Sequence, residues 1–102
     1  MKLYKYTAVF TLEKGETDVY NVSFSALPEI ATFGESKEEA RFMAQDALEL
    51  VILSRLEECE TIPKDKKPTT IPQGAFVEEI LVTVAHDVRS TLLTKDVKIA
   101  FT

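Results

Sequence analysis

The residues whose chemistry could support catalysis are few and widely separated in this sequence. Cys59 and His86 are its only cysteine and its only histidine, whereas a zinc site needs three or four Cys, His or carboxylate ligands. His86 and Asp87 are adjacent and could join a serine in a hydrolytic triad, but no strained nucleophile turn accompanies them. We therefore predict no catalytic residues, no metal site and no cofactor. His86 is expected at the surface or in an interface, and Cys59 as a half-buried packing residue.

Two further kinds of chemistry need residues in clusters. Gly15, Gly34 and Gly74 stand alone, so the sequence lacks the glycine-rich loop that cradles a phosphate. Paired carboxylates could hold Mg²⁺ for phosphoryl transfer, and a residual Mg²⁺-dependent nuclease is therefore one alternative. Most acidic residues, however, fall in predicted turns or on the polar face of a predicted helix, where solvation accounts for them. The Lys64–Lys67 stretch, KDKK, is interpreted as a solvated linker, with contact to an acidic partner as the alternative.

Composition narrows the class of protein. The chain has 102 residues, of which 45% are hydrophobic and 28% charged, as expected for a single soluble domain. Its 12 basic and 17 acidic residues give a formal charge of −5, which suits a basic partner protein better than a nucleic acid. No apolar run approaches the roughly 20 residues that span a bilayer. One cysteine excludes an internal disulfide and fits the cytoplasm.

Alternating hydrophobicity predicts an antiparallel hairpin near the N-terminus. Residues 3–12, LYKYTAVFTL, and residues 19–24, VYNVSF, both have a period of two and are joined by a short polar turn. Pro28 should end the second strand because proline has no N–H to give to a sheet. IATF, residues 30–33, is then a short third strand, and Gly34 is expected to supply a permissive turn after it.

A long helix is predicted from about residue 37 to about residue 59. Ser36 and Glu39 have the spacing of a capping box, in which each side chain bonds the backbone N–H of the other residue. The apolar face is wide toward the C-terminal half. That width indicates burial either in the chain's own core or against another subunit. The residues that form this face are Ala40, Met43, Ala44, Ala47, Leu48, Val51 and Leu56.

The last third of the sequence predicts a linker and two strands. Residues 61–74, TIPKDKKPTTIPQG, have the composition of an extended linker. Residues 75–88 form a strand whose ILVTVA core is apolar on both faces, as in an interior or partner-covered strand. Because a helix precedes it, we expect this strand to pair parallel to an earlier one through a right-handed crossover. Residues 96–102, DVKIAFT, predict a fifth strand. The predicted oligomer interface consists of Ile80, Leu81, Val82, Val84, Ile99 and Phe101.

The order of these pieces resembles the HicB-like antitoxins. A strand with YTAVF, a strand VYNVSF, the pair LP, a short strand ending in glycine, a serine-capped helix EEARFMAQDALEL and then ECETIPKDKKP follow one another over residues 4–68. The family pattern is matched at Ser23, Phe24, Leu27, Pro28, Gly34, Glu39, Ala40, Ala47, Leu48, Ile62 and Pro63. Glu29 and Ile30 depart from it, and Glu29 would be strained if the turn needed a positive φ.

This resemblance implies an α+β fold of degenerate ribonuclease H-like type, with three antiparallel strands, one long helix and one or two further strands. Residues 1–68 would be the HicB-like core, and residues 69–102 would complete the same domain or mediate oligomerisation. Such antitoxins neutralise a small basic HicA-type toxin, an mRNA-cleaving protein, by covering its active-site histidine. Many also carry a C-terminal DNA-binding module. The residues after Pro68 predict no helix pair, so direct nucleic-acid binding is not expected. We predict a toxin-binding homodimer or higher oligomer, with an orphan scaffold lacking a toxin partner as the alternative.

Overall fold

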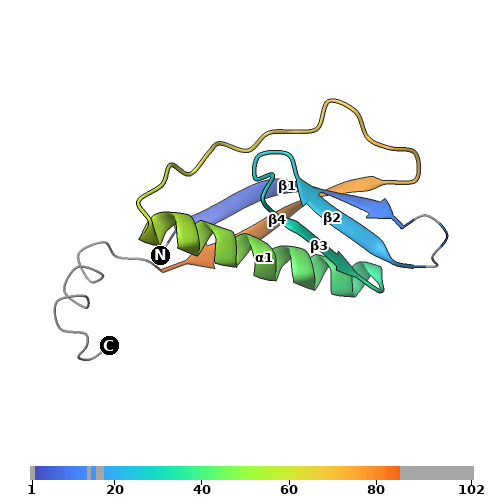
Figure 1. Cartoon of the computed structure of the whole chain (residues 1–102), viewed down its shortest axis with the longest axis horizontal. Helices are drawn as coiled ribbons and strands as arrows, with labels where there is room; N and C mark the ends of the chain where they lie inside the picture. Colours follow the sequence, from blue (N-terminus) through green and yellow to red (C-terminus); the bar gives the residue numbers. More distant parts are fainter. Residues whose placement is uncertain (1, 14, 16–17, 86–102) are drawn as a thin grey trace.

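The computed structural model describes residues 2–13, 15 and 18–85 of the chain. Within them, four strands form one antiparallel sheet in the order β3-β2-β1-β4, and one helix lies across one face of it (Figure 1). The α+β fold class is therefore confirmed. The elements are β1 (Lys2–Leu12), β2 (Tyr20–Phe24), β3 (Ala31–Gly34), α1 (Lys37–Glu57) and β4 (Phe76–Val84).

The core lies between α1 and the facing side of the sheet. Every second side chain of β1 points toward the helix, as the alternating pattern predicts, and Ala8 and Phe10 are fully buried. The rings of Phe10 and Phe76 stack with centroids 4.8 Å apart, which joins β1 to β4. α1 contributes a row of buried side chains at helical spacing, in which two alanines allow the helix to lie close to the sheet. The fully buried residues of this row are Ala40, Ala44, Leu48 and Ile52.

The start of α1 follows the predicted cap in one half only. The Glu39 N–H donates to Ser36 Oγ at 3.0 Å, but the Glu39 carboxylate accepts from the N–H of Glu35 rather than from that of Ser36. Gly34 also has a different role from the predicted one, because its φ is not positive. A Cβ at this position would lie 2.3 Å from the backbone nitrogen of Ala40. Glycine is needed here because β3 passes directly against the first turn of α1.

The end of α1 is a Schellman motif centred on Cys59. The N–H of Glu60 donates to Arg55 O at 2.8 Å, the N–H of Cys59 donates to Leu56 O at 3.2 Å, and Cys59 has a φ of 59°. Its side chain is exposed, so the expectation of a half-buried packing residue is wrong. α1 ends at Glu57, so the 3.6-residue periodicity that places helix residues toward the core no longer applies at Cys59, whose left-handed backbone directs its side chain to the surface.

The turn that departs from the family pattern is unstrained. Among the described residues with a side chain, positive φ angles occur at Asp18 and Cys59 and not at Glu29. The turn closes with the N–H of Ile30 donating to Leu27 O at 3.0 Å. Glu29 instead pairs with Arg55 near the end of α1, at 2.8 Å. A hydrogen bond from its own backbone N–H, together with the Arg55 guanidinium, lowers the pKa of the Glu29 carboxyl.

β4 runs antiparallel to β1, with Lys2 opposite Val84 and Phe10 opposite Phe76, so the prediction of a parallel strand with a right-handed crossover is wrong. The reason is that α1 carries the chain along the sheet once and residues 58–75, called here the linker segment, carry it back (Figure 1). The chain therefore enters β4 beside the start of α1, where Lys37 Nζ lies 5.3 Å from the centre of the Phe76 ring. The predicted fifth strand, residues 96–102, lies outside the described residues.

Candidate protein-binding surface

The residues that could have carried catalysis are not brought together. Among the described residues, no group of three or more His, Cys, Asp or Glu side chains is placed to hold a metal ion. Cys59 lies alone at the end of α1, and His86 falls outside the described part of the chain.

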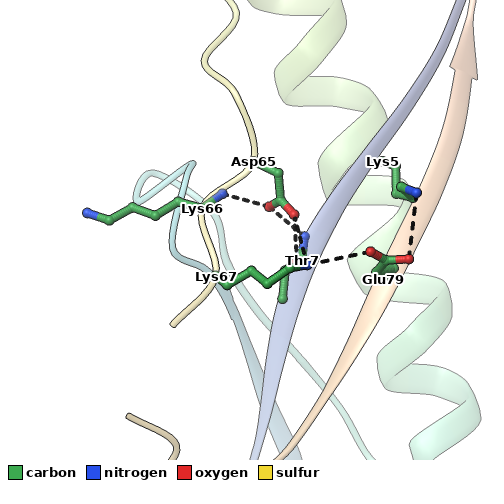
Figure 2. A network of polar contacts seen from close by, with 6 residues as sticks. All are labelled: Lys5, Thr7, Asp65, Lys66, Lys67 and Glu79. Carbon is green, nitrogen blue, oxygen red and sulfur yellow. Dashed lines mark hydrogen bonds and ion pairs between the residues drawn. The ribbon is translucent and has the colours of Figure 1, made fainter. Parts of the chain in front are cut away.

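One polar network holds the linker segment on the sheet (Figure 2). Asp65 Oδ1 accepts from the backbone N–H of Thr7 at 2.9 Å, and Oδ2 accepts from the Thr7 hydroxyl at 2.6 Å. β2 pairs with β1 only from Ala8 onward, so no neighbouring strand can bond the Thr7 N–H. The Asp65 carboxylate takes the place of that missing strand. All four residues of KDKK are exposed, as the interpretation of a solvated linker predicts, but the Asp65 side chain is only 24% exposed and is bound to β1, which that interpretation does not include.

Two lysines extend this network to β4. Lys67 Nζ lies 3.9 Å from Asp65 Oδ2 and 3.6 Å from Glu79 Oε2, and Lys5 Nζ lies 3.9 Å from Glu79 Oε1 (Figure 2). The lysines and Glu79 are about half exposed or more, so each of these ion pairs adds little to stability. Thr7, Asp65, Lys67 and Glu79 are called the linker clamp below. It connects β1, the linker segment and β4.

Burial and hydrogen bonding act against each other on the Asp65 carboxyl. Its partial burial raises the pKa, while the hydrogen bonds from Thr7 and Lys66 and the nearby charge of Lys67 lower it, with a net decrease. The neighbouring Tyr6 hydroxyl donates to the carbonyl of Pro63. Burial, and then the Asp65 charge, raise the pKa of Tyr6. The clamp is therefore built for an ionised Asp65.

β4 is an edge strand of the described sheet, and its outer edge faces α1 side chains. The carbonyl of Leu81 points away from β1, because it accepts from Gln45 Nε2 on the helix at 2.8 Å. Backbone groups alternate in direction along an antiparallel strand. The N–H and C=O groups of Val77, Glu79 and Thr83 therefore point outward as well. This row of backbone donors and acceptors, called the free edge of β4, resembles the edges that proteins usually protect.

A groove lies between the free edge of β4 and α1. Its volume is about 210 Å³. Phe42 is 66% exposed there, and Asp46 and Glu49 form no ion pair with another described residue. Arg41, one turn away, is already held by Glu78 through two 2.7 Å hydrogen bonds, which lower the pKa of the Glu78 carboxyl. The groove is therefore acidic and carries one aromatic ring. Phe42, Gln45, Asp46, Glu49, Val82 and Thr83 line it and define what is called the edge groove below.

The predicted oligomer interface is divided by the fold. Ile80, Val82 and Val84 are 5–6% exposed because they face α1 of their own chain, which explains most of the apolar pattern of ILVTVA. Leu81 lies on the opposite face and is 44% exposed. Ile99 and Phe101 fall outside the described residues. Sequence reasoning missed the edge groove, although an aromatic residue at position 42, on the polar side of the helix, was a signal for it.

Other surfaces are less specific. A larger hollow of about 380 Å³ lies on β1, β2 and β3, and its lining is uncharged. Phe33 is 53% exposed at its margin. Within the described ranges, no helical segment has the length and hydropathy of a membrane span.

Comparison with known proteins gives a consistent result. A family model described as HicB_like antitoxin of bacterial toxin-antitoxin system matches residues 5–88. The fold is similar to a chain of a toxin–antitoxin complex from Streptococcus pneumoniae, with a TM-score of 0.67 and 16% identity over 93% of this chain and 88% of that one. It is also similar to the N-terminal domain of the Burkholderia pseudomallei antitoxin HicB, with a TM-score of 0.57 and 18% identity over 81% of this chain and all of that one. A search of curated proteins gives no significant match.

Proposed function

Because the chain belongs to the HicB-like antitoxin family of bacterial toxin–antitoxin systems, we propose that it binds and neutralises a small, basic, HicA-type toxin. The observation that carries this proposal is the family match, which spans the sheet and α1 rather than one short motif. In this proposal the protein acts in the cytoplasm. It covers the active site of the toxin and so keeps mRNA out, a task of binding that needs no catalytic group of its own.

The charge of the chain supports this mechanism. A formal charge of −5 attracts a basic partner over distances of about a Debye length, roughly 8 Å at physiological salt. Opposite charges on two proteins chiefly raise the association rate and the specificity of the complex. A toxin that must be inhibited soon after synthesis benefits from rapid association.

Co-expression tests the proposal. The protein encoded by the adjacent reading frame should arrest growth when induced alone and should not do so when this chain is induced with it. In a purified assay, stoichiometric amounts of this chain should stop RNA cleavage by that protein. A neighbouring product that is harmless, or toxicity that this chain does not relieve, would contradict the proposal and favour the orphan scaffold. RNA cleavage by this chain alone, dependent on Mg²⁺, would instead favour the residual nuclease.

Self-association is a second part of the proposal. Leu3 and Leu81 are 56% and 44% exposed. They are diagonal neighbours on the face of the sheet opposite α1, because Leu81 lies opposite Lys5, two residues after Leu3. Such a pair of leucines would be covered in a homodimer. Sedimentation at tens of micromolar should give a mass above the 11.5 kDa of one chain, and Leu81→Lys should lower it. An 11.5 kDa species at that concentration would contradict this part.

A further inference from the structure

We propose that the free edge of β4 and the edge groove bind an extended segment of a basic partner protein, which adds to the sheet as a further strand. The inference rests on the proposed function, since the partner it names is the toxin. It goes further by assigning the contact to one edge of the sheet, to one face of α1 and to a particular mode of recognition, strand addition.

The backbone of β4 supplies the first argument. β4 is nine residues long, about 30 Å at roughly 3.3 Å per residue, and its other edge is fully paired with β1. At the free edge, the Leu81 carbonyl accepts a hydrogen bond from the Gln45 side chain of α1 at 2.8 Å. An incoming strand can replace it with a backbone N–H. Gln45 therefore protects the edge without closing it permanently.

The edge groove supplies the second argument, which concerns the chemistry of the occupant. In an added strand every second side chain would point to the α1 side of the sheet. There it would meet the exposed ring of Phe42 and the carboxylates of Asp46 and Glu49, neither of which forms an ion pair with another described residue. A lysine or arginine fits this lining best, because its alkyl stem covers the ring while its charge reaches the carboxylates. The groove therefore selects a strand with basic residues at alternate positions.

The same charges disfavour a second copy of this chain as the occupant. Two β4 strands pairing across a two-fold axis would place the two α1 helices side by side. Asp46 and Glu49 of one copy would then approach those of the other copy. The two arginines of the helix, Arg41 and Arg55, are already paired with Glu78 and Glu29. Like charges brought together across an interface oppose its formation.

Binding of the full-length chain to the purified product of the adjacent reading frame tests this inference. One variant, Asp46→Lys with Glu49→Lys, reverses the charge of the groove. Its matched control, Glu57→Lys with Glu60→Lys, changes the net charge by the same amount at the end of α1 and beyond it. The groove variant should raise the Kd by about tenfold to a hundredfold, and the control by less than about threefold.

A second pair of variants tests the backbone contact. Thr83→Pro removes an outward N–H and leaves the ladder with β1 intact, since proline is tolerated at the open side of an edge strand. It should raise the Kd at least about tenfold, while Thr83→Ala should bind as the wild type does. Circular dichroism confirms that each variant is folded, and the charge reversal decides the matter if Thr83→Pro unfolds the chain.

The outcomes separate the inference from the proposed function. Tight binding of the wild type with unchanged affinity in the groove variants would refute the inference and leave the antitoxin role standing. Absence of binding by the wild type would refute both. If the variants abolish self-association and leave toxin binding unchanged, the occupant is a second copy, and the inference is wrong.

Discussion

Removing the Asp65 carboxylate should destabilise the chain, because it removes the side chain that anchors the linker segment to β1. Asp65→Ala leaves the backbone N–H and the hydroxyl of Thr7 without their acceptor, and Thr7 is only 2% exposed. A hydrogen bond to a charged group contributes about 1.5–3 kcal/mol. Because the Asp65 side chain is 24% exposed, water can replace part of this loss. We therefore expect the free energy of unfolding to fall by about 2–3 kcal/mol.

Urea unfolding and thermal unfolding, both followed by circular dichroism, measure this effect. For a domain of about this size, the loss should lower the Tm by about 10–20 °C. Lys66→Ala is the matched control, because Lys66 bonds the Asp65 carboxylate only through its backbone N–H, and the change should alter the free energy of unfolding by less than about 0.5 kcal/mol. A double-mutant cycle with Thr7→Val isolates the bond between the two side chains, and its coupling energy should be about 1 kcal/mol.

The reasoning would be refuted if Asp65→Ala were as mild as Lys66→Ala. That result would mean that the linker segment keeps its course through other contacts. A coupling energy near zero with a large effect of Asp65→Ala would be a different result. It would show that the carboxylate acts through the backbone N–H of Thr7 alone.

Three more changes have definite expected results. Burial raises the pKa of Asp65 and the hydrogen bonds lower it, and the net effect keeps it below its usual 3.8. The contribution of the Asp65 carboxylate to the free energy of unfolding should therefore be full above about pH 4 and be lost as the pH falls through the folded-state pKa. Urea unfolding at a series of pH values should show a smaller loss of stability at low pH in Asp65→Asn than in the wild type. Gly34→Ala should cost about 3 kcal/mol, because its Cβ would overlap the backbone of Ala40. A Tm unchanged within error would contradict this. Cys59→Gly should stabilise the chain by about 1 kcal/mol, because it relieves a left-handed φ of 59°; lower stability in urea would show that the thiol contributes a contact.

Features that depend on neighbours in the sequence could be predicted. The period of two in LYKYTAVFTL identified the buried face of β1, and helical spacing identified Ala40, Ala44 and Leu48 as the face of α1 toward the sheet. The Ser36 cap was found because its donor lies three residues away. In each case the pattern, the hydrogen bond and the burial lie within one element or one turn.

Features that depend on distant residues could not be predicted. Thr7 and Asp65 are 58 residues apart, and nothing near either of them marks the pair. Gly34 shows the same limitation. A glycine is needed at this position because a Cβ would overlap the backbone of Ala40, and not because φ is positive there. The edge groove was partly visible as an aromatic residue on the polar side of a helix. Its other wall, Val82 and Thr83, depends on where β4 is placed.

The direction of β4 links the linker clamp to the proposed binding edge. A hydrophobic pattern determines which face of a strand is buried, but it is the same read in either direction. The direction of β4 follows from the linker segment, which runs back along the sheet before β4 begins. Asp65 holds this segment against β1 at Thr7. Because β4 then begins beside the start of α1, its later residues Val82 and Thr83 lie opposite the middle of the helix, where Phe42, Asp46 and Glu49 project. A parallel β4 would place different residues beside the helix, so the return path of the linker segment, which the clamp and the bonds to Pro63 and Thr61 hold, decides which residues line the edge groove.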